Sequence, residues 1–265
     1  MTKIIGILNL TLDSFSDGGL YYDINSAKQH VSEMIDKGAD VIDIGAESTR
    51  SGFSDVSHNN QIKTLKPIID FITKNFQIDI SIDTRSSKVI EYFKNSNISF
   101  VNDVSSGLND SDMLSCVAKL DCKYIMTHMP EEHKDGFIKR YDNILLELET
   151  FFRERIDLCI RAGIKKEKII IDPGIGFGKS GDDNYKIMKN LNYILSIHEN
   201  ICIGASNKRF SSKLFDGIET KYDLKVANLA SSAISTLEGI AYLRVHDVEI
   251  TKDAVLIIEK AKSIM

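Results

Sequence analysis

The chain has 265 residues, of which 43% are apolar and 27% charged, and its formal net charge is −5. The 33 basic residues form no run among the 38 acidic ones, so we expect no nucleic-acid partner held by phosphate contacts. We expect no membrane association either, because no apolar stretch approaches the roughly 18 residues of a spanning helix. The four cysteines form no zinc motif, and residues 1–6 run into a strand-like segment without a signal peptide, which predicts a cytoplasmic protein.

Short runs rich in β-branched residues recur along the chain and predict eight strands. Each run is nearly continuous in apolar residues, which is typical of parallel strands buried on both faces. Between the runs, apolar residues recur at helical spacing. The predicted strands lie at residues 3–8, 40–45, 78–83, 99–102, 123–126, 168–172, 201–205 and 240–245, and the clearest helices at residues 27–37, 145–156, 227–237 and 254–264.

Eight strand–helix units are compatible with two α/β architectures, a doubly wound open sheet and a closed (β/α)8 TIM barrel. The length corresponds to about 33 residues per unit, which favours the barrel. The chain has three prolines and no Gly/Ser/Pro-rich linker between halves. We therefore expect residues 1–265 to form a single barrel domain.

Polar residues follow the predicted strands. In a barrel, the carboxyl ends of all eight strands converge on one mouth, where such enzymes keep their active sites. Any single Asp, Ser or Asn there could instead cap a helix, and His246 could be a satisfied core histidine. Capping does not account for Lys208, Arg244 or His246, which are poor caps near the positive end of a helix. The polar residues of this predicted mouth include Asn9, Asp83, Asn102, Asp172, Ser206, Lys208, Arg244 and His246.

These side chains predict a substrate with a polar ring and a phosphate tail. Asp83, Asn102 and Asp172 suit a flat heterocycle that offers several N–H donors. The cations, together with Asn9, could hold a pyrophosphate directly or through a divalent metal ion. We expect the carboxylates on one side of the mouth and the cations on the other.

Two motif matches do not hold. Residues 176–181 match G-x-G-x-x-G, but the acidic residue that should close the next strand of a dinucleotide site is absent. Residues 178–180 imitate the end of a phosphate-binding P-loop, but the first glycine of that motif would fall on Pro173. The histidines and serines also lack the spacing of zinc proteases and serine hydrolases.

Six blocks of sequence, in order and spread over nearly the whole chain, closely resemble the dihydropteroate synthase family. The first, residues 6–19, reads GILNLTLDSFSDGG, and another, residues 172–179, reads DPGIGFGK; the others are residues 45–50, 82–84, 102–104 and 244–248. The resemblance implies a (β/α)8 barrel that condenses 6-hydroxymethyl-7,8-dihydropterin pyrophosphate with 4-aminobenzoate. The products would be 7,8-dihydropteroate, for folate biosynthesis, and pyrophosphate.

The resemblance also implies roles for individual residues. The pterin pocket would comprise Asp83, Asn102, Asp172, Lys208 and Phe177. The pyrophosphate site would comprise Asn9, Thr49, Arg244 and His246, with Asn9 contacting Mg²⁺. The aminobenzoate site, where sulfonamides would also bind, would comprise Ser14, Phe15, Arg50, Ser51 and Ser206. The catalytic groups would be Asp83, Lys208, Arg244 and His246, and the loops at residues 12–19 and 50–57 would order over the substrates.

Four positions depart from the family pattern. Leu12 and Ser51 replace prolines in the two loops, and Thr127 replaces a common methionine. Asn207 stands where an arginine would stack on a flat ring, and asparagine is too short and uncharged to do so. We expect weaker pterin binding than in other family members, without loss of activity.

Two other functions remain as alternatives. A related pterin-binding barrel passes a methyl group from methyltetrahydrofolate to a corrinoid protein, but it needs no pyrophosphate site. A degenerate relative could bind pterins or a partner synthase without catalysis. Family members are commonly homodimers, and residues 227–235 are small and apolar on one face, which suits either a dimer interface or packing on the barrel.

Overall fold

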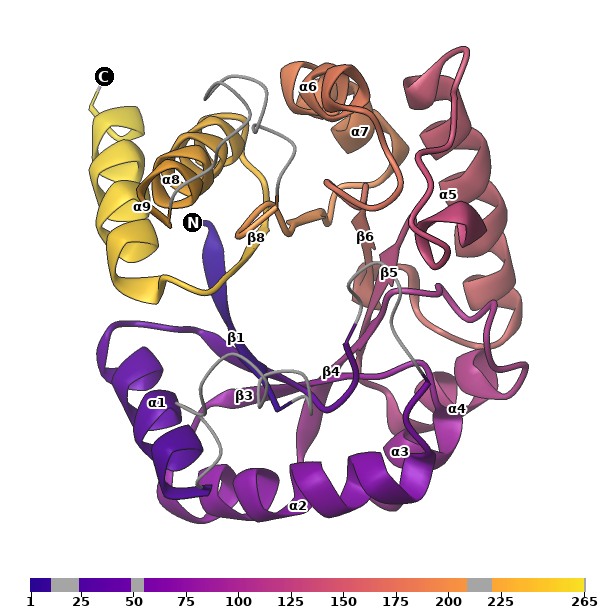
Figure 1. The fold of residues 1–265 in the computed structure, drawn as a ribbon, viewed down its shortest axis with the longest axis vertical. Coiled ribbons are helices and arrows are strands. Elements are labelled where there is room, and N and C mark those ends of the chain that lie inside the picture. Colours follow the sequence, from indigo (N-terminus) through magenta and orange to yellow (C-terminus); the bar gives the residue numbers. More distant parts are fainter. Residues whose placement is uncertain (11–23, 49–54, 209–220, 265) are drawn as a thin grey trace.

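Eight strands in the described parts of the chain form one parallel sheet, which curves into a barrel with helices around it (Figure 1). The computed structural model describes residues 1–10, 24–48, 55–208 and 221–264. The strands are β1 (Lys3–Asn9), β2 (Val41–Gly45), β3 (Asp79–Asp83), β4 (Ile98–Asp103), β5 (Lys123–Thr127), β6 (Ile169–Asp172), β7 (Cys202–Ile203) and β8 (Tyr242–Val245). All eight coincide with predicted strands, because buried parallel strands give a strong apolar signal.

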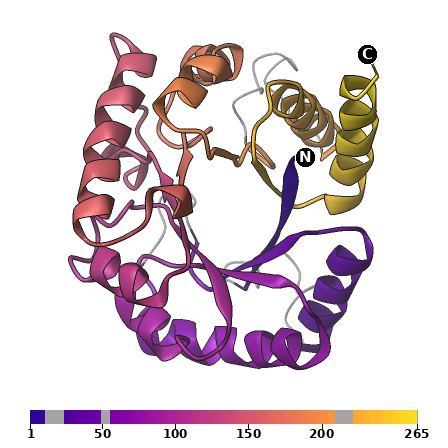
Figure 2. The same ribbon diagram turned by 180° about the vertical axis from the view of Figure 1, so that it is seen from behind.

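Helices connect the strands on the outside of the barrel, as both views show (Figure 2). They are α1 (Ile24–Asp36), α2 (His58–Asn75), α3 (Ser87–Tyr92), α4 (Met113–Leu120), α5 (Ile144–Arg161), α6 (Gly181–Lys189), α7 (Leu191–Ile197), α8 (Lys221–Leu237) and α9 (Val248–Lys262). The four helices that the sequence predicts most clearly correspond to α1, α5, α8 and α9.

The barrel closes between β6 and β7. The sheet order is β6-β5-β4-β3-β2-β1-β8-β7, and a parallel bridge joins Ile171 to Ile201 across the remaining gap. The backbone N–H of Ile171 donates to the carbonyl of Asn200 at 3.0 Å. This bridge confirms the barrel and excludes the open sheet. The strand predicted at residues 201–205 is shorter in the structure, since β7 ends at Ile203.

The interior of the barrel is apolar toward the amino ends of the strands and polar at their carboxyl ends. Val41, Phe100, Ile170 and Tyr242 belong to the buried interior cluster. Side chains two residues apart share a face of a strand. The residues two positions after these four therefore face the same interior, one layer closer to the carboxyl ends of the strands. They are Asp43, Asn102, Asp172 and Arg244.

Candidate active site

A buried cluster of charges lies inside the carboxyl end of the barrel, where Arg244 of β8 contacts two carboxylates. Its Nε and Nη2 atoms lie 2.7 Å from Asp43 Oδ2, and Nη2 lies 2.6 Å from Asp83 Oδ2. Asn102 Nδ2 donates to Asp43 Oδ2 at 3.3 Å. The register of the strands determines where the residues of this cluster lie, because Gly45, Asp83 and Asn102 are register neighbours across β2, β3 and β4. The cluster therefore has fixed positions before any substrate binds.

The electrostatics of this cluster are set by burial. Burial raises the pKa of Asp83 to about 7, although the charge of Arg244 opposes the shift. Burial disfavours the charged form of Arg244, but the carboxylates of Asp43 and Asp83 outweigh it and raise the pKa of Arg244 further. Asp43 Oδ1 is buried and has no hydrogen-bond partner within the described parts of the chain. It is a fixed acceptor available to a ligand that brings an N–H donor.

The structure corrects one expectation about this mouth. Carboxylates and cations do not occupy opposite sides, because Arg244 lies between Asp43 and Asp83. Asp43 was not among the predicted site residues. The available signal was an aspartate at the centre of an otherwise apolar strand, Val41–Gly45, since a fully buried aspartate needs partners.

Asp172 ends β6, the strand that pairs with β5. Its Oδ1 atom accepts the backbone N–H of Gly174 at 2.8 Å, and burial raises the pKa of its carboxyl group. The space beside it is kept open at Gly204, where an added Cβ would lie 3.3 Å from Asp172 Oδ2 and 4.0 Å from the Cβ of Arg244. Asp172 and Arg244 are thus neighbours across a position without a side chain.

The loop after β6 is held by Lys179, which ends the block at residues 172–179 but was not predicted as a site residue. Its Nζ donates to the carbonyls of His128, Gly174 and Phe177 at 2.8, 2.9 and 3.2 Å. Gly174 has a φ of +69° and packs so closely that an added Cβ would lie 2.2 Å from the carbonyl oxygen of His128. Burial lowers the pKa of Lys179 to about 7. The role of Lys179 in this structure is to fix the loop.

Lys208 and Phe177 meet at the same mouth. Lys208 Nζ lies 3.6 Å from the centroid of the Phe177 ring, in a cation–π contact. The Phe177 ring also makes an edge-to-face contact with His133, with ring centroids 5.0 Å apart and an interplanar angle of 74°. His133 Nδ1 accepts the backbone N–H of Gly178 at 3.1 Å. The loops after β5 and β6 therefore support the ring over which Lys208 lies.

Ser206 and His246 form a further pair at the ends of β7 and β8. Ser206 Oγ lies 3.0 Å from His246 Nδ1 and accepts the backbone N–H of His246 at 3.2 Å. Ser206 Oγ acts as the acceptor toward the backbone N–H of His246, so the hydroxyl hydrogen of Ser206 is available to the imidazole of His246. Two residues predicted for different subsites are thus in direct contact.

The remaining predicted site residues divide into two groups. Asn9 ends β1, is exposed and is the register neighbour of Gly45, so it lies at the rim of the mouth. Its amide oxygen is a hard donor of the kind Mg²⁺ prefers, and Mg²⁺ commonly takes most of its ligands from water and substrate phosphates. The described residues hold no group of three acidic, His or Cys side chains that could bind a metal. Leu12, Ser14, Phe15, Thr49, Arg50 and Ser51 lie outside the described residues.

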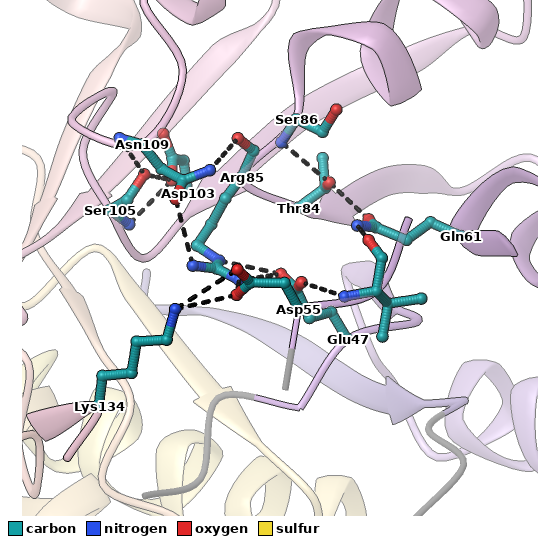
Figure 3. A network of polar contacts seen from close by, with 11 residues as sticks. Glu47, Asp55, Gln61, Thr84, Arg85, Ser86, Asp103, Ser105, Asn109 and Lys134 are labelled. Atoms are coloured by element: carbon teal, nitrogen blue, oxygen red, sulfur yellow. Dashed lines mark hydrogen bonds and ion pairs between the residues drawn. The ribbon is translucent and has the colours of Figure 1, made fainter. Parts of the chain in front are cut away.

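A second charged network lies at the outer edge of the mouth and was not predicted as part of the site (Figure 3). Arg85, two residues after β3, contacts Glu47 and Asp55. Its residues come from the segments that follow β2, β3, β4 and β5. The sequence places Glu47 and Arg85 after strands, but it does not indicate that they contact each other.

Comparisons with known proteins agree with this geometry. The family model described as pterin binding enzyme matches residues 5–246. A dihydropteroate synthase of Clostridium beijerinckii is 38% identical over 93% of this chain and 89% of its own length. The solved dihydropteroate synthase of Yersinia pestis, in a sulfonamide complex, superposes with a TM-score of 0.92 at 31% identity, covering 99% of this chain and 95% of that one. That of Xanthomonas albilineans with 4-aminobenzoic acid gives a TM-score of 0.91 at 31% identity, covering 100% and 94%.

The chain belongs to the pterin-binding enzymes and, within them, to the dihydropteroate synthase family. Membership at this identity and coverage makes it a transferase of dihydropteroate synthesis. In the parts of the chain that the structure describes, no helix has both the length and the apolar character to cross a membrane.

Proposed function

We propose that the mouth of the barrel condenses 6-hydroxymethyl-7,8-dihydropterin pyrophosphate with 4-aminobenzoate. The observation that carries the proposal is the buried Arg244–Asp43–Asp83 cluster beside Asn102. It offers fixed acceptors, including the unpartnered Asp43 Oδ1, at the bottom of a mouth lined with cations. A corrinoid-dependent methyl transfer would need no such cations.

The pterin ring would bind between the strand ends and the loop after β6. Asp172 and Asn102 would accept the N–H donors of the ring, and Lys208 would donate to its acceptors. Phe177 already stabilises the ammonium of Lys208 through the cation–π contact. Lys208 therefore has a defined position from which it can reach the ring.

The pyrophosphate would bind to Thr49, Asn9, Arg244 and His246. Mg²⁺, held by Asn9 together with the phosphate oxygens, would supply charge neutralisation for the leaving group. Arg244 donates to Asp43 and Asp83 through Nε and Nη2, which fixes the plane of its guanidinium. His246 would donate to the pyrophosphate through Nε2, and its Nδ1 is oriented by Ser206.

The reaction would begin with ionisation of the bond between the pterin methylene carbon and the pyrophosphate oxygen. The electron pair leaves with the pyrophosphate, and the methylene carbon becomes cationic and conjugated with the ring. The carboxylate of Asp83 would stabilise this developing positive charge. The amine of 4-aminobenzoate then forms the C–N bond and loses a proton. Ser14, Phe15, Arg50, Ser51 and Ser206 would form the aminobenzoate subsite, which a sulfonamide would share.

We further propose that the protein is a cytoplasmic homodimer that uses α8 and α9. The small side chains of α8, among them Ser231, Ser232 and Ser235, are buried, so they pack toward the barrel. Larger apolar side chains of the two helices are exposed, namely Val226, Leu229, Ile234, Leu237, Ile250, Leu256 and Ile257. Such a surface is typical of a subunit interface. Sedimentation should give a dimer, and a monomer would contradict the proposal.

The activity is tested by pyrophosphate release from the pterin pyrophosphate, with and without 4-aminobenzoate and with and without Mg²⁺. We expect release that requires Mg²⁺ and is accompanied by dihydropteroate. Tight pterin binding without release would contradict the proposal and indicate a degenerate binding protein. Complementation of a strain that lacks its own synthase provides an independent check.

A further inference from the structure

The loop after β6 is attached to the loop after β5 through Gly178. Its backbone N–H donates to His133 Nδ1 at 3.1 Å, and its carbonyl accepts the backbone N–H of Lys139 at 2.9 Å. Gly178 has a φ of +56°, and an added Cβ would lie 2.6 Å from Pro130 Cγ and 3.2 Å from the Cβ of His133. The two loops are therefore in close contact, and His133 supplies the side-chain part of the attachment.

Phe177, the residue before Gly178, contacts the same histidine. The edge-to-face contact between the two rings is a geometry that stabilises aromatic pairs beyond the area they bury. Both side chains are buried, with Phe177 6% and His133 9% exposed. His133 therefore holds two successive residues of the loop, one through its ring and the other through a ring nitrogen.

Lys208 lies along this part of the loop. Its Nζ atom lies over the ring of Phe177, 3.6 Å from the centroid. Its aliphatic stem packs on Gly176, where an added Cβ would lie 3.0 Å from Cδ, 3.1 Å from Cβ and 3.2 Å from Cγ of Lys208. A displacement of residues 176–178 would therefore move the surface on which the side chain of Lys208 lies.

We propose that His133 is a positioning residue that sets the affinity for the pterin substrate. It fixes the ring of Phe177, and Phe177 in turn fixes the ammonium group of Lys208, which would donate to the pterin ring. His133 acts through these two residues and belongs to none of the proposed substrate subsites. The inference rests on the proposed function, because it concerns the first substrate of that reaction.

Two variants separate the ring of His133 from its hydrogen-bond acceptor. His133→Phe keeps an aromatic ring and removes the acceptor for the backbone N–H of Gly178. By calorimetry without 4-aminobenzoate, its Kd for the pterin pyrophosphate should rise about three- to tenfold, as the loss of one buried hydrogen bond allows. His133→Asn provides an amide oxygen in place of Nδ1 and should bind the pterin pyrophosphate more tightly than His133→Phe. The KM for 4-aminobenzoate should stay unchanged in both variants.

His198→Phe is the matched control. His198 is also a buried histidine, and its Nδ1 accepts the backbone N–H of Asn200 at 3.4 Å. It lies between α7 and β7, at the amino end of the strand and away from the mouth. This variant should keep the pterin affinity of the unaltered protein. Thermal unfolding of each variant separates loss of affinity from loss of fold.

Three results would overturn the inference while the proposed function stands. An unchanged pterin affinity in His133→Phe would show that His133 only packs the two loops together. Equal affinities in His133→Phe and His133→Asn would show that the acceptor does not position the loop. An equal loss of affinity in His133→Phe and His198→Phe would show a general effect of destabilisation. Failure of the unaltered protein to form dihydropteroate would instead contradict the proposed function, and with it the inference.

Discussion

Two arginines at the mouth of the barrel each lie between two carboxylates, but in different surroundings. Arg244 contacts Asp43 and Asp83, whose side chains are 0% and 8% exposed. Arg85 contacts Glu47, which is 6% exposed, and Asp55, which is 64% exposed. The same arrangement of charges is thus closed inside the barrel in one case and open to solvent in the other.

The difference separates two uses of an ion pair. Inside the barrel, each charge depends on the others, because none can recover its hydration if a partner is lost. Such a cluster gives a preorganised electrostatic environment for a charged transition state. At the outer edge, Asp55 can exchange Arg85 for water at little cost, so the contact sets position more than stability.

Removal of the inner guanidinium is expected to have the largest effect. Arg244→Met leaves Asp43 and Asp83 buried without a cation and should lower the free energy of unfolding by about 3–5 kcal/mol. Arg85→Met should cost less, about 1–3 kcal/mol, because only Glu47 is left buried. Urea unfolding of both variants measures the difference. An equal decrease in the free energy of unfolding in the two variants would contradict the distinction between the two clusters.

Lys179 provides a third buried cation, held by backbone carbonyls instead of carboxylates. Lys179→Met removes the donor to three carbonyls and should lower the free energy of unfolding by about 1–3 kcal/mol. It should also raise the KM for the pterin substrate, since the loop carries Phe177. Urea unfolding and steady-state kinetics check both effects. An unchanged KM would show that the loop keeps its position without Lys179.

The two clusters should respond to pH with opposite signs. The pKa of Asp83 is raised to about 7, so the folded protein keeps a proton there that the unfolded chain loses near pH 4. The stabilisation that this bound proton gives the folded state is therefore lost as the pH rises from about 4 to about 7. The pKa of Asp55 is lowered, so its contribution is present above about pH 4 and is lost at lower pH.

Variants separate these two titrations. Asp83→Asn should unfold with a weaker dependence on pH between 4 and 7 than the unaltered protein, and Asp55→Asn should differ from it only above about pH 4. The catalytic rate should also increase as Asp83 ionises near pH 7, because its carboxylate is the form that stabilises the cation. A rate independent of pH between 6 and 8 would contradict this role.

The smallest effect is expected at Asn207, beside Lys208. Asn207 has a φ of +57°, a left-handed conformation that asparagine tolerates better than most residues. Asn207→Arg should therefore lower the free energy of unfolding by less than about 1 kcal/mol, while lowering the KM for the pterin substrate. Unchanged KM values would contradict the expectation that Asn207 weakens pterin binding.

The fold was predictable because its signal is local. Continuous β-branched runs such as residues 3–8 identify strands buried on both faces, and their number favours the barrel. The strand near residue 201 was predicted too long, because Gly204 and Ala205 continue the apolar run after the pairing ends. Composition cannot show where a backbone leaves the sheet.

The site was predictable in its residue types but not in its contacts. Strand ends indicated Asp83, Asn102, Asp172 and Arg244. Asp43 was missed because it lies within a strand and its cation, Arg244, is 201 positions away in the sequence. Whether a carboxylate lies beside an arginine or opposite it depends on which strands are neighbours in the closed barrel.

The most direct test of the division between the two clusters is equilibrium binding of the pterin pyrophosphate, by calorimetry, without 4-aminobenzoate. Arg244→Lys keeps a cation in the inner cluster but loses its forked geometry, and should weaken binding at least about tenfold. Arg85→Lys should bind as the unaltered protein does. Equal weakening in the two variants would contradict a division in which the inner cluster binds the pterin substrate and the outer one does not.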